Sequence, residues 1–341
     1  MPILKSPSRI SFSHVLEKLV TPKSREAVCS IGLDVGSSQV KLLALGKRTP
    51  QAGRPILAYE SFTRPSADDQ LAAKLRETVD RLKLPSRSVN LSVNGPSVIL
   101  RVVEMPAMPA SELKRALPFE AQRYLPFPIQ EVTLDGEILG NIDPKRVWVL
   151  LVACKKDVIE TRLEWVRRAG LDPGVMDVDA LALTNSFLKA ALSKRHAPTS
   201  ALVHTGAQFS SVVIFKEATP YLVRDIPWGA DRLLKELCEQ SGWEAERVRR
   251  GLQSGDSSEE FRSVLKSVCE SLVVELQLSF DYFENQFGQP PEEIFLSGGL
   301  AKSESFFDAM KQHLAQGIAR WEPSDGLSGE FAVAYGLALR S

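Results

Sequence analysis

The sequence carries no excess charge of either sign and has few cysteines and histidines. Lys plus Arg equals Asp plus Glu, at 42 each in 341 residues, so no overall charge attracts the chain to nucleic acid. The four cysteines and four histidines are scattered and form no CxxC pair. This excludes the ligand spacing of a zinc site and favours reduced thiols.

Long apolar runs are also missing. The longest, VWVLLVAC at residues 147–154, is too short to span a bilayer and is typical of a buried strand. The N-terminus is basic but has no unbroken apolar region followed by a small-residue cleavage site, so a signal peptide is not indicated. We therefore expect a cytoplasmic chain, or one held on the cytoplasmic face of a membrane complex.

Residues 1–27 form a basic, proline-containing appendage with one periodic segment. Its apolar side chains recur at helical spacing, at Phe12, Val15, Leu16 and Leu19. Two interpretations remain open for the predicted helix. It packs against the protein itself or frays, or it lies on a membrane surface or a partner.

The remaining length suffices for two domains or one elaborate domain. The alternation of strand and helix patterns predicts an α/β protein. Within residues 89–170 we expect Ser111 to cap a helix that Pro118 kinks or restarts. The predicted parts are a first lobe at 28–88 and 171–197, an inserted subdomain at 89–170, and a second lobe at 198–341 with a helical subdomain near 230–289.

The stretch IGLDVGSSQVKLLAL, residues 31–45, predicts two short strands around a polar corner. Gly36 offers a positive φ, and Ser37 and Ser38 offer hydroxyl groups. Taken alone, such a corner is either an ordinary hairpin turn or a set of amides directed at an anion.

The same design recurs in the second half of the chain. ALVHTGAQFSSVVIFK at residues 201–216 is again strand, Gly-containing corner and strand, and IFLSGGLAK at 294–302 adds a third corner. This internal repeat predicts a duplicated architecture. Glycine corners after apolar strands suit phosphate binding by backbone amides, so the pattern indicates a two-lobed, ribonuclease H-like actin fold.

The order of the three corners and the closing AVAYGLAL helix resemble the actin-like ATPase superfamily. Within it, ALPFEAQRYLPFPIQEVTLDGEIL at 116–139 and DVDALALTNSF at 177–187 resemble the PilM family of type IV pilus assembly proteins, relatives of FtsA. The resemblance covers residues 31–339. It implies that residues 89–170 are the extra subdomain of that family.

The resemblance implies a site for ATP and Mg²⁺. Asp34 would order the magnesium ion and its waters, and Lys41 would point back to the phosphates. The amides and hydroxyls of the first corner would face the phosphates, which suits a magnesium-bound polyphosphate. The full set of expected cofactor-binding residues is Asp34, Gly36, Ser37, Ser38, Lys41, Gly206, Gln208, Glu275, Ser279, Gly298 and Gly299.

Two positions depart from the family pattern. His204 stands where relatives have an Asp, and an imidazole supplies neither the negative charge nor the oxygen ligand that a hard cation prefers. Leu278 stands where relatives often carry an Arg, and we expect it to face inward. We therefore predict weak ATP binding and negligible hydrolysis, and we assign no catalytic residue.

The resemblance implies a cytoplasmic scaffold at the inner-membrane platform of a pilus machine. Its expected partners are the short tail of PilN, a bitopic membrane protein, and other platform and motor components; a homo-oligomer is left open. Phe119, Tyr124 and Phe127 lie on a proline-stiffened segment and are candidate anchors for the tail, or else ordinary core residues. The alternatives are an actin-fold ATPase or kinase and an FtsA-like filament protein, although this chain ends without the FtsA-type linker and membrane helix.

Overall fold

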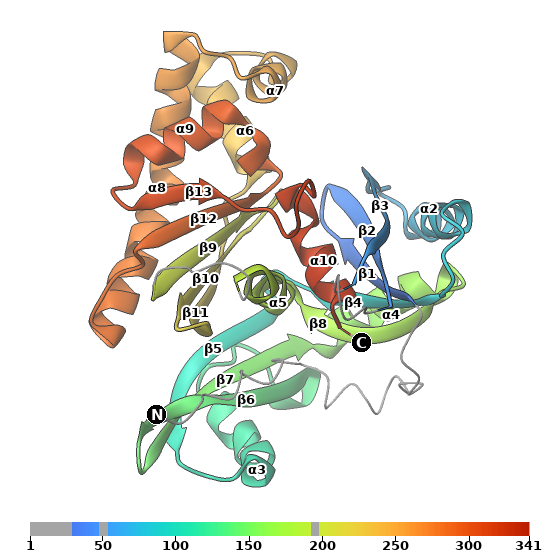
Figure 1. Cartoon of the computed structure of the whole chain (residues 1–341), viewed down its shortest axis with the longest axis vertical. Helices are drawn as coiled ribbons and strands as arrows, with labels where there is room; N and C mark the ends of the chain where they lie inside the picture. The colour runs from blue at the N-terminus through green and yellow to red at the C-terminus, as the bar shows by residue number, and fades with distance from the viewer. Residues whose placement is uncertain (1–28, 48–53, 192–197, 341) are drawn as a thin grey trace. The chain divides into compact units, whose positions relative to one another are not determined.

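The computed structural model describes residues 29–47, 54–191 and 198–340. The helix predicted within residues 1–27 lies outside this part of the chain. The chain divides into two compact units (Figure 1). The first comprises Met1–Ser186 together with Val333–Ser341, and the second comprises Phe187–Ala332.

The first unit is built on a mixed sheet that, within the described residues, has five strands in the order β3-β2-β1-β4-β8. The first three pair antiparallel, whereas β4 and β8 continue the sheet in parallel. The strands are β1 (Cys29–Val35), β2 (Gln39–Gly46), β3 (Ile56–Thr63), β4 (Ser88–Val93) and β8 (Asp172–Val178). The helices are α2 (Asp68–Arg81) and α4 (Lys156–Arg168), together with the part of α5 (Asp179–Ala191) up to Ser186 and the part of α10 (Ala332–Ala338) from Val333.

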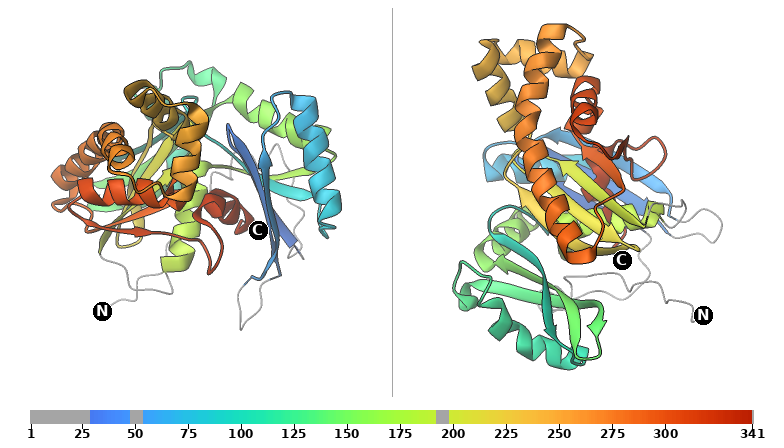
Figure 2. Two further views of the ribbon diagram at one scale, coloured as in Figure 1. Left: turned by 90° about the horizontal axis from the view of Figure 1, so that it is seen from above. Right: turned by 90° about the vertical axis from the view of Figure 1, so that its left-hand side faces the viewer.

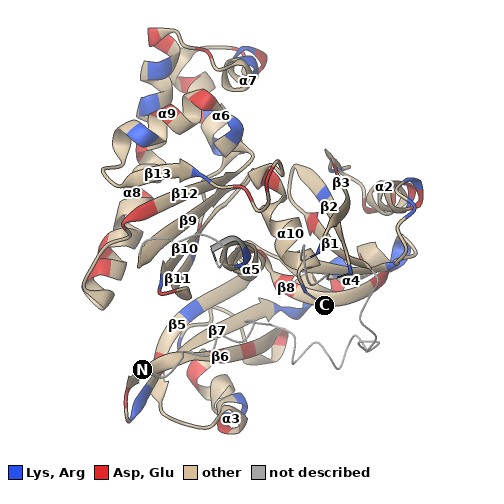
Figure 3. Cartoon of the chain, viewed as in Figure 1, with Lys and Arg blue, Asp and Glu red and all other residues tan. Residues whose placement is uncertain are grey.

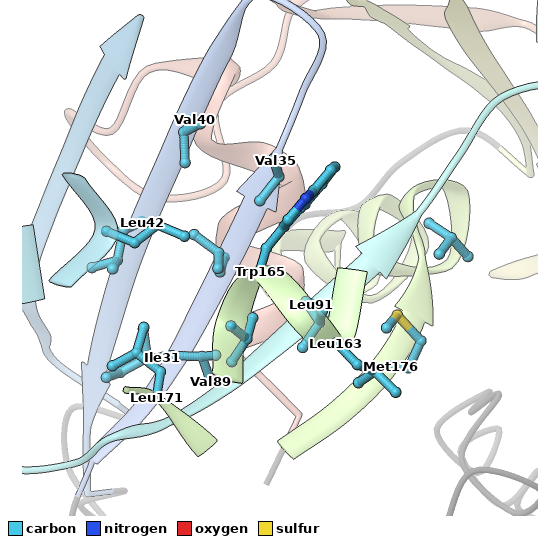
Figure 4. Close-up of a cluster of buried hydrophobic side chains, with 14 of the residues drawn as sticks. Ile31, Val35, Val40, Leu42, Val89, Leu91, Leu163, Trp165, Leu171 and Met176 are labelled. Carbon is cyan, nitrogen blue, oxygen red and sulfur yellow. The ribbon is translucent and has the colours of Figure 1, made fainter. Parts of the chain in front are cut away.

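One face of this sheet carries the apolar core of the unit. Side chains alternate along β1, so Ile31 and Val35 point to one face and Asp34 to the other. On the apolar face, the strands pack against Leu163 and Trp165 of α4, as Figure 4 shows, and against α2. The opposite face of β1 is therefore left to polar and small residues.

Helix α10, the last helix of the chain, packs directly on the backbone of the first unit. A Cβ atom at Gly32 of β1 would lie 1.9 Å from the carbonyl oxygen of Ala334, and one at Gly336 would lie 1.8 Å from that of Ala182 in α5. Only glycine allows these approaches. The expectation that the second lobe extends to residue 341 is therefore wrong for the last helix.

The inserted subdomain is a three-stranded antiparallel sheet covered by one helix (Figures 1 and 2). Leu117 of the helix lies over the glycine at position 136, where a Cβ would be 2.9 Å from the leucine methyl carbons. Its elements are β5 (Val98–Pro106), α3 (Ala110–Ala121), η1 (Ile129–Glu131), β6 (Val132–Asp143) and β7 (Arg146–Lys155), with sheet order β5-β7-β6.

Strand pairing corrects the expected limits of the insertion. Residues 89–93 lie in β4, which pairs with β1 and β8 of the first sheet. Helix α4 contributes Ile159 and Val166 to the core of that sheet. The insertion therefore runs from β5 to β7 rather than over residues 89–170.

The start of α3 also differs from the expectation. The helix begins at Ala110 with Pro109 in the N-cap position and no capping side chain, so Ser111 is not the cap. Pro118 lies inside the helix, which continues to Ala121 without restarting. Pro118 has no N–H, so the helix lacks the hydrogen bond that this residue would otherwise donate.

The second unit repeats the strand order of the first. Its sheet is β11-β10-β9-β12-β13, again with an antiparallel hairpin followed by parallel strands in the described part of the chain. Figure 2 shows α8 lying along one face of this sheet. The elements are β9 (Thr199–Thr205), β10 (Ser210–Lys216), β11 (Thr219–Ile226), α6 (Ala230–Ser241), α7 (Ala245–Ser254), α8 (Glu259–Phe287), β12 (Glu293–Gly298), η2 (Leu300–Lys302), α9 (Glu304–His313), β13 (Gly317–Arg320) and η3 (Gly329–Phe331).

Two further predictions concern membrane-spanning helices and the state of the cysteines. No helix in the described ranges is long and apolar enough to cross a bilayer. All four cysteines are free, as expected, and burial raises the pKa values of Cys154 and Cys269 to about 12. Those two thiols are therefore not reactive at neutral pH.

A buried ion pair fixes the C-terminal segment to the first unit. Nε and Nη2 of Arg340 lie 2.7 and 2.6 Å from Oδ2 of Asp177 at the end of β8. The carbonyl oxygen of Arg340 accepts hydrogen bonds from Ser30 Oγ and Asn90 Nδ2. Burial raises the pKa of Asp177, and the Arg340 charge opposes that rise.

We expect Arg340→Met to lower the free energy of unfolding by about 3–5 kcal/mol, because it leaves the buried Asp177 carboxylate without its cation. Urea unfolding followed by circular dichroism measures this. Arg167→Met is the matched control, since Arg167 pairs with Glu160 at 3.8 Å on the surface and such pairs contribute about 1 kcal/mol or less. Equal losses in both variants would contradict the role given to the buried pair.

Candidate functional site

The first corner is a tight hairpin between β1 and β2. The Gly36 N–H donates to the Gln39 carbonyl oxygen at 3.0 Å. A Cβ at Gly36 would lie 2.9 Å from that oxygen. Gly36 is not among the described glycines that have a positive φ. The prediction that the corner uses Gly36 for a positive φ is therefore wrong. The residue is required for the close approach of the turn and not for a left-handed conformation.

Asp34 and Lys41 face each other across this hairpin. They are direct partners in the strand register, and Lys41 Nζ lies 2.9 Å from Asp34 Oδ2. Asp34 is buried, whereas Ser37 and Ser38 are exposed at the tip. The structure thus brings together the carboxylate and the ammonium group that were expected at a magnesium–phosphate site. Their ligand roles stay predictions.

A second carboxylate, which the sequence analysis missed, belongs to the same cluster. Asp179, the first residue of α5, accepts hydrogen bonds from Ser92 Oγ at 2.5 Å and Asn94 Nδ2 at 2.6 Å. Burial, together with the negative charge of Asp34, raises the pKa of Asp179 to about 7, although the hydrogen bonds from Ser92 and Asn94 oppose the rise. In the sequence this residue resembles an ordinary acidic helix start, so only the fold shows its proximity to Asp34.

Two arginines lie beside the same corner. Arg162 Nη1 donates to the Val35 carbonyl oxygen at 2.8 Å, and Arg64 Nη1 is 3.5 Å from the Gly36 carbonyl oxygen. Both guanidinium groups lie over the ring of Trp165, at 4.6 and 4.7 Å from its centroid. Burial lowers the pKa of Arg162, while Asp179 opposes that change. The first corner therefore combines two carboxylates with nearby cations.

The second corner repeats the geometry of the first. The Gly206 N–H donates to the Phe209 carbonyl oxygen at 2.9 Å, and a Cβ at Gly206 would lie 2.8 Å from that oxygen. Gln208 is exposed at the tip. The N–H groups of Ala230 and Asp231, at the start of α6, donate to carbonyl oxygens of this corner at 3.0 and 2.9 Å. These two helix amides are therefore already used within the protein.

The charge pair of the first corner has no equivalent in the second. His204 occupies the position of Asp34 and faces Ser211 in the register, as Asp34 faces Lys41. His204 Nδ1 lies 2.9 Å from Ser297 Oγ of β12. Ser211 Oγ donates to Asp225 Oδ1 of β11 at 2.6 Å. The sequence analysis missed Asp225, whose strand it did not recognise.

The third corner is joined to the second. Gly298 has φ +92°, and a Cβ there would lie 2.3 Å from the Thr205 carbonyl oxygen. The Gly299 N–H donates to the same oxygen at 3.2 Å. Glycine is therefore obligatory at position 298. The structure brings the two corners of the second unit together. The nucleotide roles of Gly206, Gly298 and Gly299 stay predictions.

Glu275 and Ser279 lie on α8 beside β11. Arg224 Nη2 is 2.6 Å from Glu275 Oε2, and its Nη1 donates to Ser279 Oγ at 3.1 Å. Two strands separate β11 from β12, which carries the Gly298 corner. The nucleotide role of Glu275 and Ser279 stays a prediction. Leu278 is 54% exposed, so the expectation that it faces inward is wrong.

The three candidate anchor residues differ in exposure. Phe119 on α3 is 76% exposed. Tyr124 is half-buried against the core of the inserted subdomain. Phe127 is half-buried too, with Lys155 Nζ at 5.5 Å from its ring centroid. For all three residues, both a role as anchor and a role in the core were left open. Phe119 is exposed, whereas Tyr124 and Phe127 are half-buried.

The first corner fits a magnesium-bound phosphate. Within residues 29–47, 54–191 and 198–340, no group of three or more His, Cys, Asp or Glu side chains is placed to hold a metal ion. Mg²⁺ does not need such a cage, because it is usually bound by one or two carboxylates together with substrate phosphates. Asp34 and Asp179 match that requirement, whereas the second corner has His204 where a carboxylate would be needed.

The duplicated sheets and their glycine corners define an actin-like ATPase fold. A protein from Bacteroides thetaiotaomicron described by that fold and of unknown function matches with a TM-score of 0.51, at 10% identity over 92% of this chain and 96% of that one. The ethanolamine utilization protein EutJ from Carboxydothermus hydrogenoformans matches with a TM-score of 0.57, at 13% identity over 95% and 93%. These two likenesses show the fold alone.

The family follows from two further comparisons. The sequence model of the family described as type IV pilus assembly protein PilM matches residues 32–341. A solved structure described as the PilM-PilN type IV pilus biogenesis complex matches with a TM-score of 0.79 and 26% identity, over 93% of this chain and 99% of that one. The chain belongs to the PilM family.

The raised pKa of Asp179 predicts a pH dependence of stability. In the unfolded chain an Asp has a pKa near 3.9, so between about pH 4 and pH 7 the folded state binds a proton that the unfolded state has lost. The stabilisation is complete below about pH 4 and is lost as the pH rises through about 7.

We expect the free energy of unfolding of the metal-free protein to fall between pH 4.5 and 7.5 by about 2 kcal/mol more than that of Asp179→Asn. One pKa unit corresponds to about 1.4 kcal/mol, and the expected difference is smaller than the full pKa shift would give because Asp34 shares the site. Urea unfolding across this pH range in the presence of a chelator measures it. Asp172→Asn, at an exposed position of β8, should follow the natural protein, and parallel curves for all three proteins would contradict the prediction.

Proposed function

We propose that this protein is a scaffold of the type IV pilus assembly platform that binds the cytoplasmic tail of a PilN-like membrane protein. The observation that carries the proposal is the likeness, over nearly the whole of both chains, to a structure described as a PilM-PilN complex. The family match over residues 32–341 supports it. Binding a membrane-anchored tail would hold the protein at the inner membrane, where further platform and motor components would meet it.

The anchor for the tail is best placed on α3 of the inserted subdomain. Phe119 is the most exposed of the large apolar side chains among the described residues. An exposed aromatic ring gains more from a partner than from water, and aromatic anchors are frequent among residues that dominate binding energy. Tyr124 and Phe127 are half-buried, so they would present edges of their rings while supporting the subdomain.

We further propose that the protein binds Mg²⁺-ATP weakly through the first corner. Asp34 and Asp179 would hold the ion through its waters, and the exposed Ser37 and Ser38 would face the phosphates. A bound magnesium ion would neutralise phosphate charge and replace Lys41 as the partner of Asp34. The second corner offers His204, which is tied to Ser297, so the negative charge expected there is missing. This supports binding without efficient hydrolysis.

Phe119→Ala should weaken binding of a peptide copy of the PilN-like tail by about 1–3 kcal/mol, the usual range for important anchors. Because the Phe119 side chain is exposed, the thermal unfolding temperature of the Phe119→Ala protein should equal that of the natural protein. Tyr124→Ala and Phe127→Ala should weaken binding by similar amounts but also lower that temperature, since both contact the subdomain. Titration calorimetry and thermal unfolding give the two readouts.

Leu57→Ala is the matched control for the peptide titration, because Leu57 is an exposed apolar residue of β3, outside the inserted subdomain. It should bind the peptide like the natural protein. Full affinity in folded Phe119→Ala, Tyr124→Ala and Phe127→Ala proteins would show that the tail binds elsewhere.

His204→Asp should increase the affinity for ATP in the presence of Mg²⁺ by about tenfold or more, equivalent to about 1.4 kcal/mol, because it adds a carboxylate at the second corner. Calorimetric titration of ATP with and without Mg²⁺ measures this. Ser297→Ala, which removes the partner of the imidazole without adding charge, should show no such gain. Hydrolysis by the natural protein at about 1 per second or faster, an ordinary enzymatic rate, would contradict the proposal.

A further inference from the structure

Two guanidinium groups lie at the carboxyl end of β1 without an ion pair. Arg162 of α4 donates from Nη1 to the Val35 carbonyl oxygen at 2.8 Å, and Arg64 Nη1 lies 3.5 Å from the carbonyl oxygen of Gly36. Within the described ranges, neither group forms an ion pair with a carboxylate. The two side chains, named here the arginine pair, therefore carry positive charge that no carboxylate neutralises by direct contact.

The ring of Trp165 holds the arginine pair in place. The guanidinium groups of Arg162 and Arg64 lie 4.6 and 4.7 Å from its centroid. The ring is itself fixed, because it is only 7% exposed and packs beside Val35, as Figure 4 shows. Guanidinium groups that are already stacked on a buried ring lose little freedom when they bind a ligand.

The two carbonyl contacts use only a small part of each guanidinium group. Each contact takes one N–H, whereas an arginine head carries several N–H donors in a planar fork. That fork matches the spacing of phosphate oxygens, which it binds by two parallel hydrogen bonds. A role restricted to the carbonyl oxygens of Val35 and Gly36 would leave most of these donors to water.

The arginine pair belongs to the same cluster as the candidate magnesium ligands. Strands β1, β4 and β8 run parallel, and ligands of α/β sheets bind at the carboxyl ends of such strands. Asp34 lies near this end of β1, while Asp179 follows β8 and is held by Ser92 and Asn94 at the end of β4. The charges of Asp179 and Asp34 both act on Arg162. All of these residues belong to the first unit.

Cations outnumber carboxylates in this cluster. Lys41, Arg64 and Arg162 stand against Asp34 and Asp179, and the Asp34 charge is already paired with Lys41 at 2.9 Å. Figure 3 shows basic and acidic residues on β1, β2 and α4. A surplus of positive charge attracts an anion, and the attraction grows with the charge of that anion. The cluster therefore favours a polyphosphate even before a magnesium ion contributes.

We propose that the arginine pair binds a phosphate group directly, with no metal ion between them, and makes the first corner selective for the longer polyphosphate chain. This inference rests on the proposed nucleotide site and names the residues that distinguish ATP from ADP there. Mg²⁺ would strengthen the binding of ATP but would not be required for it.

Calorimetric titration with ATP, ADP and inorganic tripolyphosphate, each in excess chelator, tests the proposal. The natural protein should bind ATP and tripolyphosphate about tenfold more tightly than ADP. Arg162→Gln should weaken the binding of both triphosphates at least about tenfold and that of ADP less, although glutamine retains an N–H for the Val35 carbonyl oxygen. Arg64→Gln should act in the same direction, and its longer contact with Gly36 makes it the safer variant for folding.

Arg167→Gln is the matched control, since Arg167 lies on the same helix and pairs on the surface with Glu160. It should bind all three probes like the natural protein, and thermal unfolding shows which variants are folded. Equal affinities of the natural protein for ATP and ADP would overturn the inference. Full affinity for ATP in folded Arg162→Gln and Arg64→Gln proteins would overturn it as well.

Two outcomes separate this inference from the proposed function. Binding of ATP that requires Mg²⁺ would overturn the inference and leave the proposed nucleotide site intact. Binding of tripolyphosphate that depends on Arg162, without binding of ATP in either condition, would overturn the nucleotide site and support the arginine pair as a phosphate site. Failure of every probe to bind, with and without Mg²⁺, would overturn both.

Discussion

A contact between a glycine and a carbonyl oxygen three residues later shapes both hairpins on which the candidate site is built. At Gly36 and at Gly206 the amide donates to that oxygen, and a Cβ would lie within 3 Å of it. The turn is therefore tight enough to end one strand and start the next with their polar residues in register. Each turn therefore positions the candidate residues of its own hairpin, Asp34 and Lys41 in the first unit and His204 and Gln208 in the second.

The two hairpins share a backbone but differ in charge. In the first, Asp34 faces Lys41 and lies near a second carboxylate whose pKa is raised to about 7. In the second, His204 faces a serine and is held by Ser297. The carboxylates that could bind a metal ion are thus found at the first corner, and the equivalent position of the second holds an imidazole. This difference is the basis for proposing nucleotide binding without efficient hydrolysis, because the charge that develops during phosphoryl transfer needs stabilisation from several sides.

Large exposed apolar side chains lie on separate elements of the described chain. Phe119 is on α3 of the inserted subdomain, whereas Val274, Leu278 and Tyr282 are on α8 of the second unit. Their surroundings differ, because residues 267–287 contain four acidic residues and no Lys or Arg, whereas α3 carries charges of both signs. Surfaces of different charge favour partners of different charge.

The duplicated architecture and the three glycine corners could be predicted from the sequence, because they depend on local strand patterns and on the positions of glycines. The family could be predicted from the segments at 116–139 and 177–187. The resemblance assigned Asp34 and Lys41 to one site, and the strand register showed that they face each other across the hairpin. Features that depend on distant segments could not be predicted from local patterns. Asp179 is held by Ser92 and Asn94 close enough to Asp34 for that charge to raise its pKa. Arg340 reaches Asp177 across 163 positions, and residues 89–91 pair with β1 rather than with the insertion. The exposure of Leu278 was likewise misjudged, because a helical pattern shows which side chains share a face but not which face the rest of the protein covers.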